Sequence, residues 1–181
     1  MSAEVVLYDT TLRDGMQGFG LQLTVDHKVR IARRLDALGV PYVEGGWPGA
    51  NPRDTAVFEA LARQPLGQAR LAAFGATRRA HVAATEDLGL AATLAAGTPV
   101  VTLVGKASRW QVEAVLRTTP TENLAMIGDS VAYAVARGHE VIFDAEHFFD
   151  GYAHDAGYAL ATVERALAAG ARWVVLCDTN G

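Results

Sequence analysis

The chain has 181 residues, of which 50% are hydrophobic and 20% are charged, and its formal net charge is −4. This composition is typical of a globular protein, and the length suits one domain with a substantial core. The weak negative charge and the lack of a basic run give no reason to expect nucleic acid or an anionic membrane as a partner.

Cellular location is predicted from the single cysteine and from the N-terminus. Cys177 has no second cysteine with which to form a disulfide, so a reducing cytoplasm is the default. The N-terminus has no signal-peptide pattern, and no apolar run approaches the ~20 residues that span a bilayer. We therefore expect a cytoplasmic protein, in which Cys177 is a small buried hydrophobe and not a nucleophile.

One junction recurs along the chain: a helix end, a glycine, and then a short apolar run. A glycine at a helix end takes the left-handed backbone conformation without a Cβ clash. The runs that follow do not alternate polar with apolar residues, which is typical of strands buried on both faces of a parallel sheet. The four junction glycines are Gly39, Gly97, Gly138 and Gly170.

Strands and helices are predicted to alternate from the N-terminus onward. The expected strands cover residues 5–9, 41–45, 70–75, 99–104, 140–145 and 172–177. The expected helices cover residues 25–38, 52–63, 83–96, 108–117, 121–137 and 155–169. This alternation predicts a parallel α/β fold.

Two architectures compete, a doubly wound sheet and a (β/α)8 barrel. The turn after the first strand reads DTTLRDGMQG, which lacks the G-x-G-x-x-G spacing of the usual nucleotide-binding sheet. Charged and polar residues follow several strands, and a barrel gathers such positions on one face. A barrel takes roughly 250 residues. We therefore predict a partial TIM barrel with about six of its eight parallel strands, in which residues 1–181 form one truncated domain without a second.

The adjacent residues Arg13 and Asp14 follow the first expected strand. A carboxylate there can bind a divalent cation, and a guanidinium can stabilise an enolate or keto oxygen. A helix-capping Asp and a surface Arg explain the same pair equally well. Glu44 is placed at the end of the second expected strand, where it is either exposed or, if buried, in need of a partner such as Arg13.

A second group of candidates follows the fifth strand. Glu146 and His147 could serve in proton transfer, although a histidine beside two phenylalanines is more often structural. The glycines at 45, 46 and 49 either let a ligand approach the backbone or form a plain tight turn.

Four stretches of the chain resemble one known superfamily. The run YDTTLRDGMQ, Tyr8–Gln17, is similar to the opening motif of the DRE-type TIM metallolyases. Three further stretches, Tyr42–Pro52, Phe143–Tyr152 and Leu176–Gly181, narrow the resemblance to the citramalate-synthase branch. The isopropylmalate branch typically has a shorter glycine-phenylalanine-proline element where this chain reads GGWPG.

The resemblance implies an acyltransferase of isoleucine biosynthesis that condenses acetyl-CoA with pyruvate to give (R)-citramalate and CoA. A divalent metal ion, Mg, Mn or Zn, is the implied cofactor, and acetyl-CoA is the co-substrate. By match to the motif, Asp14 is a metal ligand, Arg13 stabilises the enolate or keto oxygen, and Gln17 lines the same site.

The resemblance also implies roles for residues on later strands. Glu44 and Glu146 are expected to hold or polarise the reacting centre, and Thr179 to contact the carboxylate of the 2-keto acid. The superfamily's remaining protein ligands are two histidines of a His-x-His element on the seventh strand, which this chain does not contain. We therefore expect the chain alone to be inactive, with exposed sheet edges and apolar surface.

Two alternatives remain open at this point. The parent protein, expected to be a homodimer, could be a 2-isopropylmalate synthase, a homocitrate synthase or a lyase of the same superfamily. The chain could also be a non-catalytic truncated paralogue that acts as an interaction module.

Overall fold

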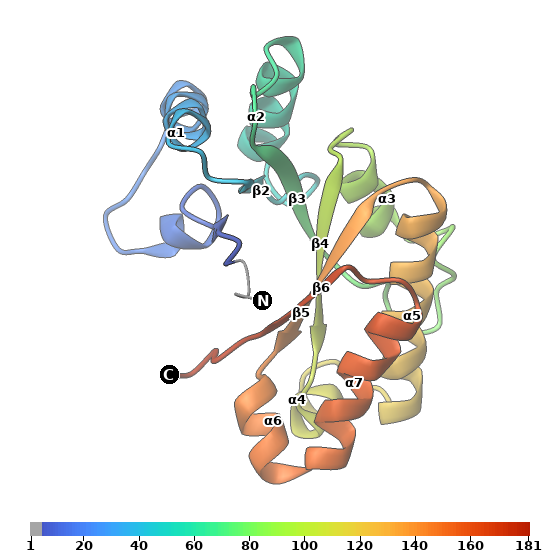
Figure 1. Cartoon of the computed structure of the whole chain (residues 1–181). Coiled ribbons are helices and arrows are strands. Elements are labelled where there is room, and N and C mark those ends of the chain that lie inside the picture. Colours follow the sequence, from blue (N-terminus) through green and yellow to red (C-terminus); the bar gives the residue numbers. More distant parts are fainter. Residues whose placement is uncertain (1–4) are drawn as a thin grey trace. The chain divides into compact units, whose positions relative to one another are not determined.

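The computed structural model describes residues 5–181, which are divided between two compact units (Figure 1). The first unit contains the chain up to Phe74 together with Ala92–Val100. The second unit contains Gly75–Ala91 and Val101–Gly181.

The described residues contain six strands, which follow one another in the sheet in sequence order. The strands are β1 Tyr8–Asp9, β2 Tyr42–Gly46, β3 Arg70–Ala76, β4 Val100–Lys106, β5 Glu140–Glu146 and β6 Trp173–Leu176. The pairs β1–β2, β2–β3 and β5–β6 are parallel. A doubly wound sheet reverses its strand order at a switch point, whereas a barrel keeps sequence order. The order therefore favours the predicted barrel.

Seven α-helices and one short 3-10 helix occur in the described part of the chain. They are η1 Asp14–Gln17, α1 Val25–Ala37, α2 Pro52–Arg63, α3 Leu88–Leu94, α4 Arg109–Ala114, α5 Pro120–Ala136, α6 Phe148–His154 and α7 Ala156–Ala168. All four junction glycines have positive φ, between 68° and 104°. The predicted reason for these glycines is thereby confirmed.

In the first unit, α1 and α2 pack against each other and against β2. Thr24 caps α1, because its hydroxyl accepts a hydrogen bond from the His27 backbone N–H at 3.2 Å. Asn51 caps α2 in the same way through Arg53, at 2.9 Å. The apolar faces of the helices meet in a buried core of Leu12, Ala32, Val43, Val57, Leu61 and Ala69. Val43 anchors β2 in this core.

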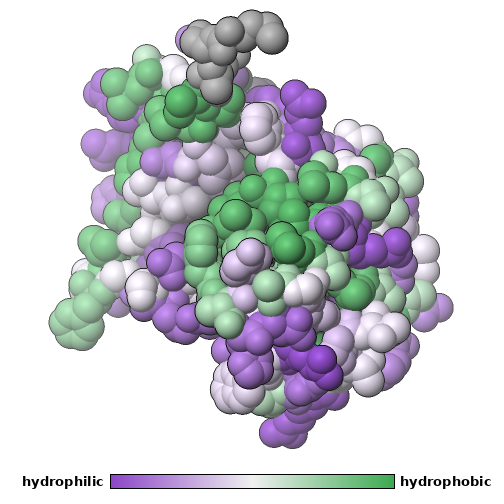
Figure 2. Space-filling model, turned by 60° about the horizontal axis from the view of Figure 1, so that its bottom comes forward, coloured by the Kyte–Doolittle hydropathy of each residue, from purple (hydrophilic) through white to green (hydrophobic). Residues whose placement is uncertain are grey.

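In the second unit, α5 and α7 lie side by side and both contact β5, while α6 packs on α7 (Figure 1). Asp155 caps α7 through the Tyr158 backbone N–H at 3.0 Å. Strand β6 leaves Trp173, Val175 and Leu176 between 38% and 45% exposed. Hydrophobic residues also gather at the surface, bordered by polar ones (Figure 2). The exposed apolar surface expected from the sequence is therefore present.

Several elements differ from prediction, and three of the differences are described here. Strand β1 has two residues, not five, and residues 5–7 before it are exposed. Helix α3 begins at Leu88, five residues later than expected, where the carboxylate of Asp87 accepts a hydrogen bond from the Leu90 backbone N–H at 2.9 Å. Helix α6 was not predicted.

Candidate active site

In the first unit, Glu44 lies at the centre of a polar group that also contains Arg13 and Tyr8. It lies within β2, not at its end as predicted, and is 0% exposed. Arg13, between β1 and η1, donates from Nε to one carboxylate oxygen of Glu44. The Tyr8 hydroxyl donates to the other oxygen at 2.6 Å. The pairing with Arg13 expected for a buried Glu44 is confirmed, and the exposed strand-end alternative is wrong.

The electrostatics of Glu44 are dominated by its burial. Burial raises the pKa of this carboxyl above its usual value, because the charged form loses its hydration. The positive charge of Arg13 and the hydrogen bonds from Arg13 and Tyr8 act in the opposite direction, and the nearby Asp14 adds to the increase. The net pKa is raised, so the Arg13 pair only partly offsets the cost of burying the acid.

The guanidinium of Arg13 is held on three sides. Besides Glu44, its Nη1 bonds the Asp14 carboxylate at 3.2 Å. Its central carbon lies 3.7 Å from the ring centroid of Phe74, a cation–π contact. The Arg13 side chain is 16% exposed. A cation fixed in this way costs little reorganisation when negative charge develops beside it.

Asp14 and Gln17 lie on η1 and are exposed, with the Asp14 side chain 58% exposed. Across residues 5–181, no three His, Cys, Asp or Glu side chains gather closely enough to hold a metal ion. Asp14 alone, bonded to Arg13, does not supply the several ligands that a tightly bound divalent ion needs. The role of Asp14 as a metal ligand therefore stays a prediction.

The two glycines that end β2 are explained by packing. A Cβ on Gly45 would lie 2.8 Å from the ring of Phe58, and one on Gly46 would lie 2.6 Å from Cγ of Asp54. Asp54 is itself buried, where it binds Lys28 Nζ at 2.5 Å and the Trp47 backbone N–H at 2.9 Å. The close neighbour of both glycines is thus helix α2. Gly49, the third glycine of this group, has φ 84° within a turn, as the tight-turn explanation predicts.

The second unit brings Glu146 next to a residue that the sequence did not single out. Glu146 is the last residue of β5, and its carboxylate forms an ion pair with Nζ of Lys106, the last residue of β4. The two side chains are 28% and 19% exposed. Lys106 ends a buried apolar run just as Glu146 does, and this shared position was the signal that could have identified it.

Thr179 lies beside the backbone that follows Glu146. Its hydroxyl accepts a hydrogen bond from the His147 backbone N–H at 3.0 Å. His147 has a left-handed backbone, with φ 58° and ψ 35°, and its side chain is 12% exposed. Its Nδ1 is buried without a hydrogen-bond partner in the described part of the chain and lies 3.9 Å from the Asp150 carboxylate. Glu146, His147 and Thr179 are therefore brought together.

The remaining candidate, Cys177, was predicted to be a small buried hydrophobe and is half-buried. Its carbonyl accepts a hydrogen bond from the Phe148 backbone N–H at 3.1 Å, which links the loop after β5 to the end of β6. The cysteine therefore contributes to this region through its backbone.

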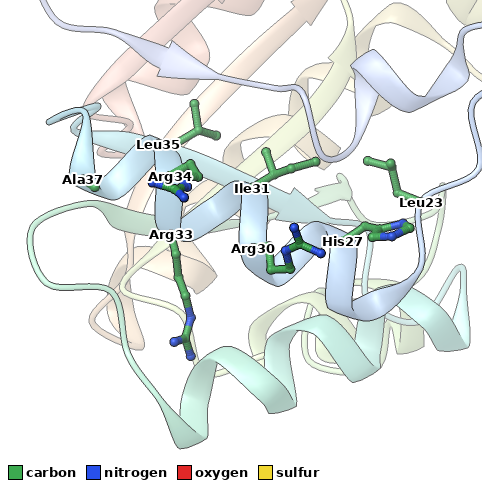
Figure 3. Close-up of a pocket in the computed structure, with 8 residues that line it drawn as sticks. All are labelled: Leu23, His27, Arg30, Ile31, Arg33, Arg34, Leu35 and Ala37. Atoms are coloured by element: carbon green, nitrogen blue, oxygen red, sulfur yellow. The ribbon is translucent and has the colours of Figure 1, made fainter.

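A hollow of about 760 Å³ lies along α1 (Figure 3). Leu23 and seven α1 side chains line it, among them Arg30, Ile31 and Arg33. None of the predicted site residues contributes to its wall.

Within residues 5–181, no helix combines the length and apolar character needed to cross a bilayer.

Comparison with known proteins bears on both fold and family. The HMGL-like family model matches residues 4–181. An (R)-citramalate synthase of Synechocystis sp. is 54% identical over 175 residues, which cover 97% of this chain and 32% of that relative. A 2-isopropylmalate synthase of Solidesulfovibrio magneticus is 35% identical over 177 residues, which cover 98% of this chain and 33% of that relative. The chain thus spans about a third of the length of the curated relatives it matches.

A solved structure supports the architecture. The crystal structure of hydroxymethylglutaryl-CoA lyase from Pseudomonas aeruginosa matches with a TM-score of 0.72 at 20% identity, covering 97% of this chain and 58% of that one. At this identity the likeness shows the fold, and it confirms the predicted partial TIM barrel. The family model, which matches almost the whole chain, shows in turn that the chain belongs to the HMGL-like family.

Proposed function

We propose that residues 1–181 are the N-terminal part of a catalytic barrel that condenses acetyl-CoA with pyruvate to give (R)-citramalate and CoA. The observation that carries the proposal is the Arg13 guanidinium, held between Glu44, Asp14 and the Phe74 ring. The 54% identity to an (R)-citramalate synthase supports the choice of product.

The proposed reaction forms one carbon–carbon bond and hydrolyses one thioester. A methyl proton leaves acetyl-CoA, and the resulting enolate carbon attacks the keto carbon of pyruvate, whose oxygen becomes an alkoxide. Protonation of the alkoxide and attack of water on the thioester then release citramalate and the CoA thiol. Negative charge develops first on the enolate oxygen and then on the alkoxide, and a preorganised cation stabilises both.

We propose that Arg13 stabilises this negative charge. Glu44 and Tyr8 act through Arg13: the carboxylate fixes the direction of Nε, and the Tyr8 hydroxyl fixes the carboxylate. Gln17, which lies on η1 and is exposed, is proposed to line the same site. Asp14 is proposed as one ligand of a divalent ion, Mg, Mn or Zn, which would polarise the keto acid when bound.

Glu146 and Thr179 are proposed to act on the keto acid side. A hydroxyl that accepts one hydrogen bond keeps its own proton, so Thr179 can donate to the pyruvate carboxylate while it accepts from His147. The Glu146 carboxylate, 28% exposed, can accept or return a proton.

The alternative functions are an enzyme that uses another keto acid or a protein that does not catalyse a reaction. A 2-isopropylmalate synthase would use 2-ketoisovalerate, and the 35% identity to one such protein keeps this reading second. A homocitrate synthase or a lyase comes after it, and a non-catalytic interaction module is the alternative outside enzymes. We further propose a cytoplasmic, homodimeric parent protein without nucleic acid or membrane partners.

The test is an assay of the parent protein that contains this chain. Acetyl-CoA, Mg²⁺ or Mn²⁺ and one keto acid are supplied, and the free CoA thiol is measured with pyruvate, 2-ketoisovalerate and 2-ketoglutarate in turn. We expect pyruvate to give the highest kcat/KM. A preference for 2-ketoisovalerate would refute the citramalate assignment. The 181 residues alone are expected to show no turnover, and a rate comparable to the parent would contradict that expectation.

A further inference from the structure

We propose that Lys106 is a positioning residue that holds the carboxylate of Glu146 in its working orientation. This inference rests on the proposed function, because it assigns Glu146 to the reaction. The geometry that carries it is the ion pair between Lys106 Nζ and Glu146 Oε2 at the ends of neighbouring strands β4 and β5.

The backbone beneath the pair is fixed from both sides. The Ala107 backbone N–H donates to the Glu146 carbonyl at 2.9 Å, which continues the β4–β5 ladder to the end of both strands. The Lys106 carbonyl accepts from Nδ2 of Asn123 at 2.9 Å. Asn123 is fully buried, and its Nδ2 also donates to the Tyr158 hydroxyl at 2.7 Å. Lys106 thus starts from a rigid point, and its side chain only has to reach across one strand spacing.

The pair differs from an ordinary surface ion pair of the same unit. Arg109 and Glu113, one turn apart on α4, are both 51% exposed, and such pairs contribute little to stability. Lys106 and Glu146 are 19% and 28% exposed, so water screens them less. The backbone already joins β4 to β5, so the ion pair is not needed to hold the strands together. What remains for the Lys106 side chain to determine is the direction of the Glu146 carboxylate.

Removal of the ammonium frees that carboxylate. A Glu146 side chain without Lys106 is drawn toward water, because its exposed fraction lets it rotate outward and regain hydration. A misplacement of about 1 Å in a reacting group can lower the rate about 100-fold. The effect should fall on kcat and not on KM, since Lys106 does not touch the substrate in this proposal.

The kinetic experiment compares Lys106→Met, Lys106→Arg and the control Arg109→Met in the parent protein. We expect Lys106→Met to lower kcat about 100-fold with both KM values unchanged. Lys106→Arg should restore most of the rate, and Arg109→Met should match the wild type. A raised KM for the keto acid at unchanged kcat would show that Lys106 binds substrate, and a wild-type rate in Lys106→Met would reduce the pair to a surface contact; both overturn the proposal.

A double-mutant cycle asks whether Lys106 acts through Glu146. If it does, Lys106→Met should have no further effect in a Glu146→Gln background, because the residue that it orients has already lost its charge. Additive losses in the two variants overturn the proposal.

Crystal structures of the parent wild type and of Lys106→Met decide the point without any assay. We expect Glu146 to contact Lys106 in the wild type and to turn to another rotamer in the variant, while the His147–Thr179 hydrogen bond stays. An unchanged Glu146 rotamer refutes the positioning role. A wild type that turns over none of the three keto acids refutes the proposed function alone, and the crystallographic comparison still decides the role of Lys106.

Discussion

The guanidinium of Arg13 is paired with the carboxylate of Glu44, and the acid of this pair is fully shielded from solvent. An unpaired charge at such a position has neither hydration nor a counter-ion. We therefore expect the pair to stabilise the first unit as well as to provide the proposed fixed cation.

Truncation of Arg13 tests how much the pair contributes to stability. Arg13→Met leaves Glu44 buried without its cation and should lower the free energy of unfolding by about 3–5 kcal/mol. Arg13→Lys should lower the free energy of unfolding by less, because the lysine keeps the positive charge. Some loss remains, because the lysine does not reproduce the fixed direction of the guanidinium. Urea denaturation gives the values, with Arg33→Met, at an exposed position, as a control that should change little. A stability loss no greater than that of the control would show that Glu44 does not need Arg13.

Glu44 should make the stability depend on pH. Its pKa is raised in the folded state, so its stabilising contribution is fully present below the usual value of 4.5 and is lost as pH rises through the folded pKa. We expect the free energy of unfolding of the wild type minus that of Glu44→Gln to fall as pH increases from 4 toward 7, as measured by denaturation at each pH.

Asp36 provides a control of opposite sign. Hydrogen bonds from the backbone N–H groups of Ala69, Gly67 and Gln68, between 2.7 and 2.8 Å long, lower the pKa of this carboxyl. Its contribution is present above the usual 3.8 and is lost as pH falls through the folded pKa. The wild type minus Asp36→Asn difference should therefore rise as pH increases toward 3.8 and change little above that value. Parallel slopes for Asp36 and Glu44 would contradict the prediction.

The close approach of α2 to β2 predicts that Gly46 does not tolerate a side chain. Gly46→Ala places a Cβ 2.6 Å from Cγ of Asp54 at a φ of 147° and disturbs the buried Lys28–Asp54 pair. We expect a loss of about 1–3 kcal/mol from overpacking alone. Gly157→Ala, in helix α7 with its nearest neighbour 3.7 Å away, should instead leave stability unchanged or raise it. Thermal unfolding of both variants gives the comparison, and a neutral Gly46→Ala would refute the packing explanation.

Much of the fold could be predicted because its signals are local. Helix α2 has the predicted bounds of 52–63, since Asn51 and Pro52 mark its start unambiguously. Helix α6 could not be predicted in the same way, because Gly151 and two phenylalanines do not favour a helix. The glycine is explained only by tertiary packing: a Cβ there would lie 2.5 Å from the carbonyl oxygen of Ala107. A contact between residues more than forty positions apart cannot be recognised from the local sequence pattern.

The site likewise contains features that the sequence predicts and features that depend on tertiary structure. Pairing of Arg13 with Glu44 could be predicted, since a carboxylate within an apolar run needs a cation if it is buried. The Tyr8 hydroxyl bond to Glu44 could not, because it depends on the register that sets Tyr8 opposite Tyr42. Lys106 was not predicted as a site residue, because a lysine at the end of a strand normally indicates a solvent-exposed position.

The left-handed backbone at His147 yields a prediction that separates its Cβ from its ring. At φ 58° a Cβ crowds the following carbonyl and costs roughly 1–2 kcal/mol, which glycine avoids. His147→Ala removes the ring but keeps the Cβ, whereas His147→Gly removes both, so we expect His147→Gly to be the more stable of the two variants. His139 has negative φ, and there the alanine variant should be the more stable. Chemical denaturation of the four variants tests this reversal of order; the same order at both positions would mean that the turn relaxes and stores no strain.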